Sequence, residues 1–125
     1  MSETVSFMLG GQRFEYDREK NEINIKKHGI SFEAAARVFF DEDYIEEYDW
    51  EHSDEEQRYN VIGDTSAGNI TYGYAVIGSI RRFYDDKNDI LYVVYTERSG
   101  SDVIRIISAR LANNFERGLY YGQYL

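Results

Sequence analysis

The sequence predicts an α+β domain in which two N-terminal helices precede a four- to five-stranded antiparallel sheet and a C-terminal helix follows the sheet. Two observations favour this class. The first 40 residues contain two helix start signals, whereas residues 58–109 contain β-branched and aromatic runs separated by closely spaced turns. Turns this short leave no room for the helical crossovers that join neighbouring parallel strands.

The chain is long enough to form one domain around one apolar core, because 42% of its 125 residues are hydrophobic. We expect a single domain over residues 1–125, in which residues 1–13 could form a flexible arm and residues 66–89 an extended hairpin. The absence of cysteine excludes disulfides and thiolate metal sites. No apolar run is long enough for a signal peptide or a membrane span, so the sequence predicts a cytoplasmic protein.

Capping residues define the two N-terminal helices, which follow a short strand at residues 14–17. Asp17 is a suitable N-cap for a helix over about residues 18–28, and Gly29 is suited to ending that helix. Ser31 is a suitable cap for a second helix that runs to about Phe40. The apolar residues of the second helix form one stripe, which consists of Phe32, Ala35, Ala36 and Phe39.

The remaining elements are strands and one last helix. The expected strands are Tyr44–Asp49, Arg58–Asp64, Ile70–Tyr84, Ile90–Glu97 and Val103–Ala109. Asn113 and Glu116 have the spacing of a capping box that would open the last helix, and Gly122 would end it. Apolar residues recur every four positions around this helix and are expected to pack against the sheet: Leu111, Phe115 and Leu119.

The net charge of −9 is concentrated in one segment, since residues 41–60 contain ten acidic residues and one arginine. This acidic segment does not fit an EF-hand, because Ile45 and Glu46 occupy positions that require a ligand and a glycine. It is either a solvated face or a docking surface for a basic protein partner. Salt screens charges over about 8–10 Å, so a cationic site elsewhere is compatible with the net charge.

Metal-free cleavage of RNA requires a base, an acid and fixed cations that stabilise charge on the phosphate. Four arginines near the C-terminus could supply the cations: Arg98, Arg105, Arg110 and Arg117. Arg105 has apolar neighbours in a predicted strand, so it either binds phosphate or forms an ion pair with Glu97 across the hairpin. Arg110 would face away from Arg105 in a straight strand, and the two could share a site only if the chain turned near Ser108.

Other candidates remain open between a chemical and a structural role. His28 could act as an acid or base near neutral pH, or it could bond to the last carbonyls of its helix. Glu97 could be a base or the ion-pair partner of Arg98. Tyr95, on the same strand face as Glu97, could stack on an RNA base or pack within the sheet.

Two sequence blocks have a recognisable pattern. The first contains Phe14-Glu15-Tyr16-Asp17 and Lys27-His28-Gly29-Ile30-Ser31-Phe32, and the second contains Tyr95-Thr96-Glu97-Arg98 and Arg105-Ile106-Ile107-Ser108-Ala109-Arg110. In content and order these blocks resemble the BrnT family, and the resemblance covers about residues 14–65 and 90–117.

The resemblance implies a RelE-like fold and an endoribonuclease toxin of a type II toxin–antitoxin system. It implies an RNA substrate, a BrnA-like antitoxin as partner, and operator-DNA binding only through that antitoxin. The implied catalytic candidates are His28, Glu97, Arg98, Arg105 and Arg110, and the RNA-binding candidates are Lys27, Tyr95 and Arg117. We expect metal-independent acid/base chemistry, no cofactor and no membrane partner. The alternative is a non-catalytic BrnT-like module that only binds an antitoxin or repressor partner.

Overall fold

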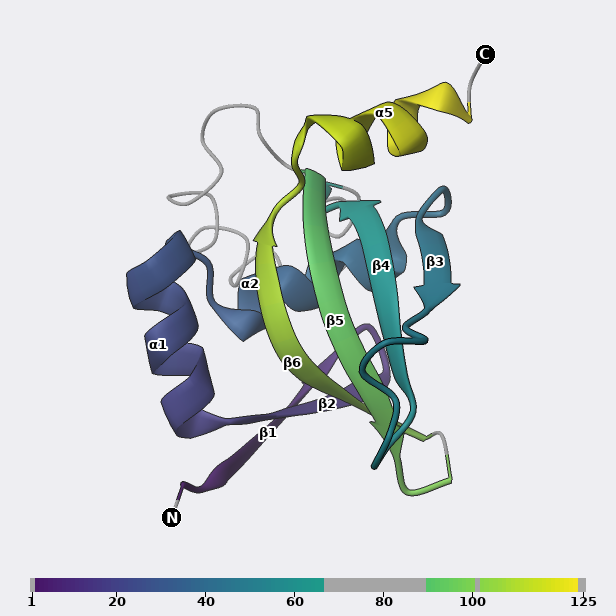
Figure 1. Ribbon diagram of the computed structural model, residues 1–125. Helices are drawn as coiled ribbons and strands as arrows, with labels where there is room; N and C mark the ends of the chain where they lie inside the picture. Colours follow the sequence, from purple (N-terminus) through teal and green to yellow (C-terminus); the bar gives the residue numbers. More distant parts are fainter. Residues whose placement is uncertain (1, 67–89, 101, 124–125) are drawn as a thin grey trace.

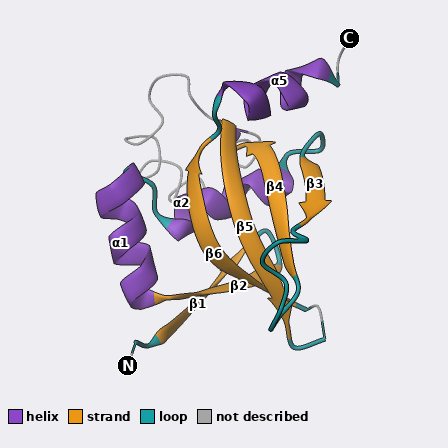
Figure 2. Cartoon of the chain, in the orientation of Figure 1, coloured by secondary structure: helices purple, strands orange, loops and turns teal. Residues whose placement is uncertain are grey.

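The computed structural model of the protein describes residues 2–66, 90–100 and 102–123, which form a six-stranded mixed sheet and its helices (Figures 1 and 2). The strands are β1 (Thr4–Leu9), β2 (Gln12–Asp17), β3 (Ile45–Tyr48), β4 (Arg58–Asp64), β5 (Ile90–Arg98) and β6 (Val103–Leu111). The helices are α1 (Arg18–His28), α2 (Phe32–Ala35), the 3-10 helix η1 (Ala36–Phe40) and α5 (Asn114–Gly122). The strand order is β1-β2-β6-β5-β4-β3.

The predicted fold class is wrong, because the sheet has six strands and is mixed rather than antiparallel. The predicted strand at residues 14–17 is part of β2, and β1 precedes it as the other strand of a hairpin, within the residues 1–13 that were expected as a flexible arm. The sequence does carry a signal for this hairpin. Gly10 and Gly11 have φ angles of 54° and 82°, and positive φ at both central positions is the requirement of a two-residue type I′ turn.

The parallel pair consists of β2 and β6 and is short, running from Arg13 opposite Val103 to Glu15 opposite Arg105. Short turns exclude parallel pairing between strands that follow one another along the chain. They do not exclude pairing between a strand near the N-terminus and one near the C-terminus. Turn lengths between neighbouring strands therefore carry no signal for this contact.

The predicted helix boundaries are confirmed where they rest on capping. The side chain of Asp17 caps α1, and Gly29 ends α1 in the left-handed conformation with φ 72°. Ser31 caps α2, and Asn113 and Glu116 form the complete capping box of α5. The second helix is not continuous to Phe40, because α2 gives way to η1 after one turn.

The predicted strands in the described part of the chain are confirmed to within about two residues. The structure has β3 within Tyr44–Asp49 and β4 over Arg58–Asp64, and it extends the predicted last two strands slightly to give β5 and β6. The predicted strand Ile70–Tyr84 lies outside the described residues, as does all but the first residue of the expected hairpin at residues 66–89.

The sheet separates two apolar clusters. The larger cluster lies on the inner face, which is covered by α2 and η1, and includes Phe14, Phe32, Val38, Val93 and Ile106. The smaller cluster lies on the outer face, where α5 crosses the upper end of β4 and β5 in the view of Figure 1. It consists of Ile62, Ile90, Ala112 and Tyr120, with Ile45 and Tyr92 against it.

Helix α1 is attached to the sheet through a buried asparagine rather than an apolar stripe. Asn24 is 7% exposed, whereas its neighbours Ile23 and Ile25 are exposed. The Asn24 Nδ2 donates to the carbonyl oxygens of Ile30 (2.9 Å) and Ala109 (2.8 Å), and Oδ1 accepts from the Ala109 N–H (3.3 Å). In the described residues β2 pairs with β6 only as far as Arg105. Beyond that point Asn24 supplies the hydrogen-bond partners of the backbone N–H and carbonyl groups of Ala109 on the edge of β6.

We expect Asn24→Ala to lower the free energy of unfolding by about 2–4 kcal/mol, because it leaves buried backbone groups of Ala109 and Ile30 without partners. Urea denaturation measures this change. The matched control is Asn114→Ala, which removes an exposed asparagine from the first turn of α5 and should cost less than about 0.5 kcal/mol. Equal losses in the two variants would show that this amide does not attach α1.

Candidate functional site

A β-bulge in β6 determines which arginines lie together. The pairing of β5 with β6 shifts register next to Ile107, where one extra residue of β6 enters the ladder. Arg105 therefore lies opposite Thr96, and Arg110 lies opposite Tyr92. Thr96 and Tyr92 point to the same face of β5, because they are separated by an even number of residues. Both arginines are consequently on the outer face, which a straight strand would not allow.

Three arginines surround Thr96 on the outer face, at the end of the sheet that is distant from α5. We call Arg58, Arg98 and Arg105 the arginine cluster. Arg58 of β4 and Arg105 of β6 are the direct cross-strand neighbours of Thr96. Their backbones are separated by two strand spacings, about 10 Å. Arg98 follows on the same face of β5. Thr96 is 2% exposed, and its hydroxyl donates to the carbonyl of Gln57 at 2.6 Å.

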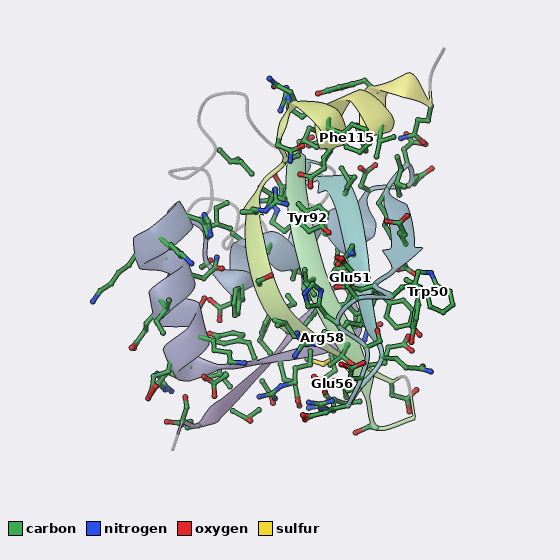
Figure 3. The ribbon with its side chains drawn as sticks, in the orientation of Figure 1. Trp50, Glu51, Glu56, Arg58, Tyr92 and Phe115 are labelled. Atoms are coloured by element: carbon green, nitrogen blue, oxygen red, sulfur yellow. The ribbon has the colours of Figure 1, made fainter. Side chains whose placement is uncertain are left out.

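Carboxylates of the same chain pair with each member of the arginine cluster. Glu56 accepts from Arg98 at 2.8 Å and lies 3.6 Å from Arg58, and Figure 3 shows Glu56 and Arg58 side by side. Arg105 donates to Glu15 at 2.6 Å, which joins β6 to β2. The hydrogen bond from Arg98 lowers the pKa of Glu56, so Glu56 is ionised at neutral pH.

A polar cavity of about 260 Å³ lies beside the arginine cluster. Its lining includes Glu56, Gln57, Tyr59, Thr96, Glu97, Arg98 and Gly100. Glu97 and Arg98 both line this cavity, but they are consecutive residues of β5, so Glu97 points to the inner face with Tyr95 and Arg98 points to the outer face. Arg58 and Arg105 do not line the cavity. A carboxylate and a guanidinium that reach one cavity from opposite faces of a strand are suited to proton removal and to the stabilisation of phosphate charge.

The other predicted catalytic residues lie toward the opposite end of β6. Arg110 is five residues beyond Arg105, or about 16 Å along the strand. It donates to both carboxylate oxygens of Glu116 at 2.8 Å and lies over the ring of Tyr92 at 4.2 Å. His28 is exposed and lies one turn after Asn24, which contacts Ala109, so it belongs to the Arg110 end of the sheet.

The three predicted RNA-binding residues are also separated. Lys27 is exposed on α1, and Arg117 lies on α5 over the ring of Tyr121 at 5.7 Å. Tyr95 is buried on the inner face, where it stacks on Tyr59 and donates to Glu46 at 2.6 Å. Burial and the Glu46 contact raise the pKa of Tyr95. Of the two roles open for Tyr95, the structure supports packing within the sheet.

Two sequence interpretations are corrected by these contacts. The ion-pair partner of Arg105 is Glu15 rather than Glu97, because β2 lies on the free side of β6. Arg58 was not selected as a candidate, although it belongs to the arginine cluster. Two features of the sequence could have identified Arg58. It is the one lysine or arginine within residues 41–60, and it is the first residue of a predicted strand.

Within residues 2–66, 90–100 and 102–123, no group of three His, Cys, Asp or Glu side chains is arranged to bind a metal ion. Over the same ranges, none of the helices has the length and apolar character that crossing a membrane requires.

The chain matches one protein-family model, described as the ribonuclease toxin BrnT of type II toxin–antitoxin systems, over residues 16–83. The match covers more than half of the chain and ends before β5 and β6. It therefore includes His28 and Arg58 but not Glu97, Arg98, Arg105 or Arg110. A search of curated proteins gave no match.

The ion pair between Glu116 and Arg110 predicts a pH dependence of stability. Burial alone would raise the pKa of Glu116, but hydrogen bonds from Arg110 and the Asn113 N–H lower the pKa below the ordinary value of 4.5. When the pKa of a carboxyl is lower in the folded state, its ionised form stabilises the fold at every pH above its ordinary pKa. This contribution is lost as the pH falls through the folded-state pKa.

We expect Glu116→Gln to lose less stability than the parent protein when the pH falls from 6 to below the folded-state pKa of Glu116. Urea denaturation across this pH range measures the difference. Glu42→Gln changes an exposed glutamate and should keep the parental pH dependence. If Glu116→Gln behaves like this control, the Arg110 pair does not contribute to acid unfolding.

Proposed function

Because the chain belongs to the BrnT family of ribonuclease toxins of type II toxin–antitoxin systems, we propose that it is an endoribonuclease that cleaves mRNA without a metal ion and is neutralised by a BrnA-like antitoxin. The observation that supports this proposal is the polar cavity that is lined by Glu97 and by Arg98, one member of the arginine cluster. The cavity is open, so a flexible single strand of RNA could enter it. We further propose that the protein acts in the cytoplasm, where its mRNA substrate is present.

In the proposed reaction, the Glu97 carboxylate removes the proton of a ribose 2′-hydroxyl. The 2′-oxygen then attacks phosphorus and the bond from phosphorus to the 5′-oxygen breaks, which leaves a 2′,3′-cyclic phosphate. The leaving 5′-oxygen takes its proton from water in the open cavity. Arg98, which lines the cavity, and Arg105, which lies on the same outer face beyond the cavity lining, are proposed to bind the phosphate oxygens, where planar guanidinium groups stabilise the additional charge of the transition state.

The remaining predicted residues fit contacts with flanking nucleotides better than the cleavage step. Arg110 lies about 16 Å along β6 from Arg105. His28 ends α1, whose Asn24 contacts Ala109 beside Arg110. One nucleotide of an extended strand spans less than this distance, so these side chains would contact RNA beyond the scissile bond. Lys27 and Arg117 are proposed to contribute positive charge along the same path.

One observation favours the alternative of a non-catalytic module that binds an antitoxin. Each of Arg58, Arg98, Arg105 and Arg110 is paired with a carboxylate of the same chain, as in ordinary structural ion pairs. An RNA phosphate must therefore displace Glu56 or Glu15 to bind the arginine cluster. The two functions differ in whether the protein alone stops growth.

Inducing the chain alone in a bacterial host is expected to arrest growth, and co-expression of the product of the adjacent gene should relieve the arrest. The purified protein is expected to cleave single-stranded RNA equally well with and without EDTA. Loss of cleavage in EDTA that is restored by a divalent ion would contradict the metal-free mechanism. Normal growth in the presence of folded protein would favour the non-catalytic module.

The catalytic role of Arg105 must be tested together with its ion-pair partner. Arg105→Gln alone leaves the partly buried Glu15 without a cation, whereas Arg105→Gln combined with Glu15→Gln keeps a neutral hydrogen-bonded pair. We expect the double variant to keep its melting temperature within a few degrees and to cleave RNA at least about 100-fold more slowly, because it lacks a phosphate-binding cation.

Arg117→Gln is the matched control for the Arg105 experiment, because Arg117 lies on α5 and is not part of the arginine cluster. It should reduce cleavage by less than the double variant does. A double variant that folds and cleaves RNA at the parental rate would assign Arg105 a structural role only.

A further inference from the structure

Helix α5 presents apolar residues to solvent, contrary to the prediction that they pack against the sheet. Phe115 is 73% exposed and Leu119 is 47% exposed, and Figure 3 shows Phe115 on this helix. The residues that α5 buries are Glu116 and Tyr120. Glu116 binds Arg110, and the Tyr120 hydroxyl donates to Asp41 at 2.6 Å. These polar contacts turn the helix so that its apolar side faces outward.

Leu119 borders a cavity of about 300 Å³ on the outer face of the sheet, between α5 and the edge strand β3. The apolar lining also includes Ile45, Ile62 and Tyr92, and we call these four residues the α5 groove. Figure 3 shows Tyr92 in front of β5, below α5. An exposed apolar helix side that continues into a cavity is the surface expected of a protein interface.

The surroundings of the α5 groove are acidic. Glu47 lines the cavity and is exposed. Burial raises the pKa of Tyr92, and the carboxylates of Glu116, Asp49 and Glu47 raise it further, against the opposing effect of Arg110. Glu46 and Glu47 both line the cavity, so the groove is bordered by carboxylates, which attract a basic partner. A second copy of the chain would bring its own net charge of −9 and is disfavoured.

We propose that the α5 groove is the docking surface for a basic segment of a partner protein. An apolar side chain of that segment inserts between Leu119, Ile62 and Tyr92, and its lysine or arginine residues contact Glu47. This inference rests on the proposed function in one respect, because the antitoxin is the partner expected to supply the segment. The groove lies at the opposite end of the outer face from the arginine cluster, so the two surfaces can be tested separately.

The test uses the full-length chain labelled with nitrogen-15 and titrated with a synthetic amphipathic peptide of leucine and lysine. A second peptide has glutamate in place of every lysine. We expect the basic peptide to shift the amide signals of Ile45, Glu47, Ile62 and Leu119 and the acidic peptide to shift none of them. Leu119→Ser and Glu47→Lys should each weaken binding of the basic peptide about tenfold.

A control separates the groove from general attraction to the acidic segment. Asp54→Asn combined with Glu55→Gln removes two charges from the loop between β3 and β4, outside the groove, and should change the affinity less than either groove variant. Glu47 is exposed, so Glu47→Lys remains informative if Leu119→Ser does not fold.

Equal binding of both peptides, unchanged affinity in the groove variants, or signal shifts confined to the loop would overturn the proposal. Self-association that Leu119→Ser abolishes would assign the groove to a second copy of the chain and would also overturn it. None of these outcomes depends on RNA cleavage. An inactive protein that still binds the basic peptide at the groove would contradict the nuclease proposal alone.

Discussion

The hydrogen bonds between Asn24 and Ala109 are the contact on which the placement of α1 and α2 depends. The isoleucines of α1 are exposed, so apolar burial contributes little to its attachment, and the buried amide satisfies an edge of β6 that no described strand pairs with. The same amide donates to the carbonyl of Ile30, two residues before Phe32. Phe32 is the first residue of α2 and belongs to the core. One polar side chain therefore positions the start of the apolar layer on the inner face.

The outer face combines cations with carboxylates in a way that suits an acidic protein. The arginine cluster is oriented by Glu56 and Glu15, and these carboxylates cancel much of its charge in the free protein. A phosphate that replaces Glu56 on Arg98 exchanges one anion for another, so binding in the proposed nuclease needs no extended basic surface. The acidic segment supplies one of these carboxylates, and it also carries Glu47 beside the α5 groove.

Local features were predictable from the sequence, and long-range ones were not. The caps at Asp17, Ser31 and Asn113 depend on residues within three positions, so the sequence alone identifies them. The pairing of Glu15 with Arg105 joins residues 90 positions apart, and no local pattern specifies it. The bulge at Ile107 was equally hidden, because β6 is apolar enough to accept either register. The contact of Tyr120 with Asp41 turned α5 away from the orientation that its apolar spacing favours.

The parallel pairing of β2 with β6 also constrains when the protein can complete its fold. During synthesis the N-terminal hairpin leaves the ribosome first, but its neighbour in the sheet is the last strand to be made. The hairpin, and with it the partner of Arg105, cannot pair with β6 until residues 103–111 have been synthesised. Contacts between such distant segments make folding slow. A nascent chain therefore lacks the assembled outer face until β6 has been made.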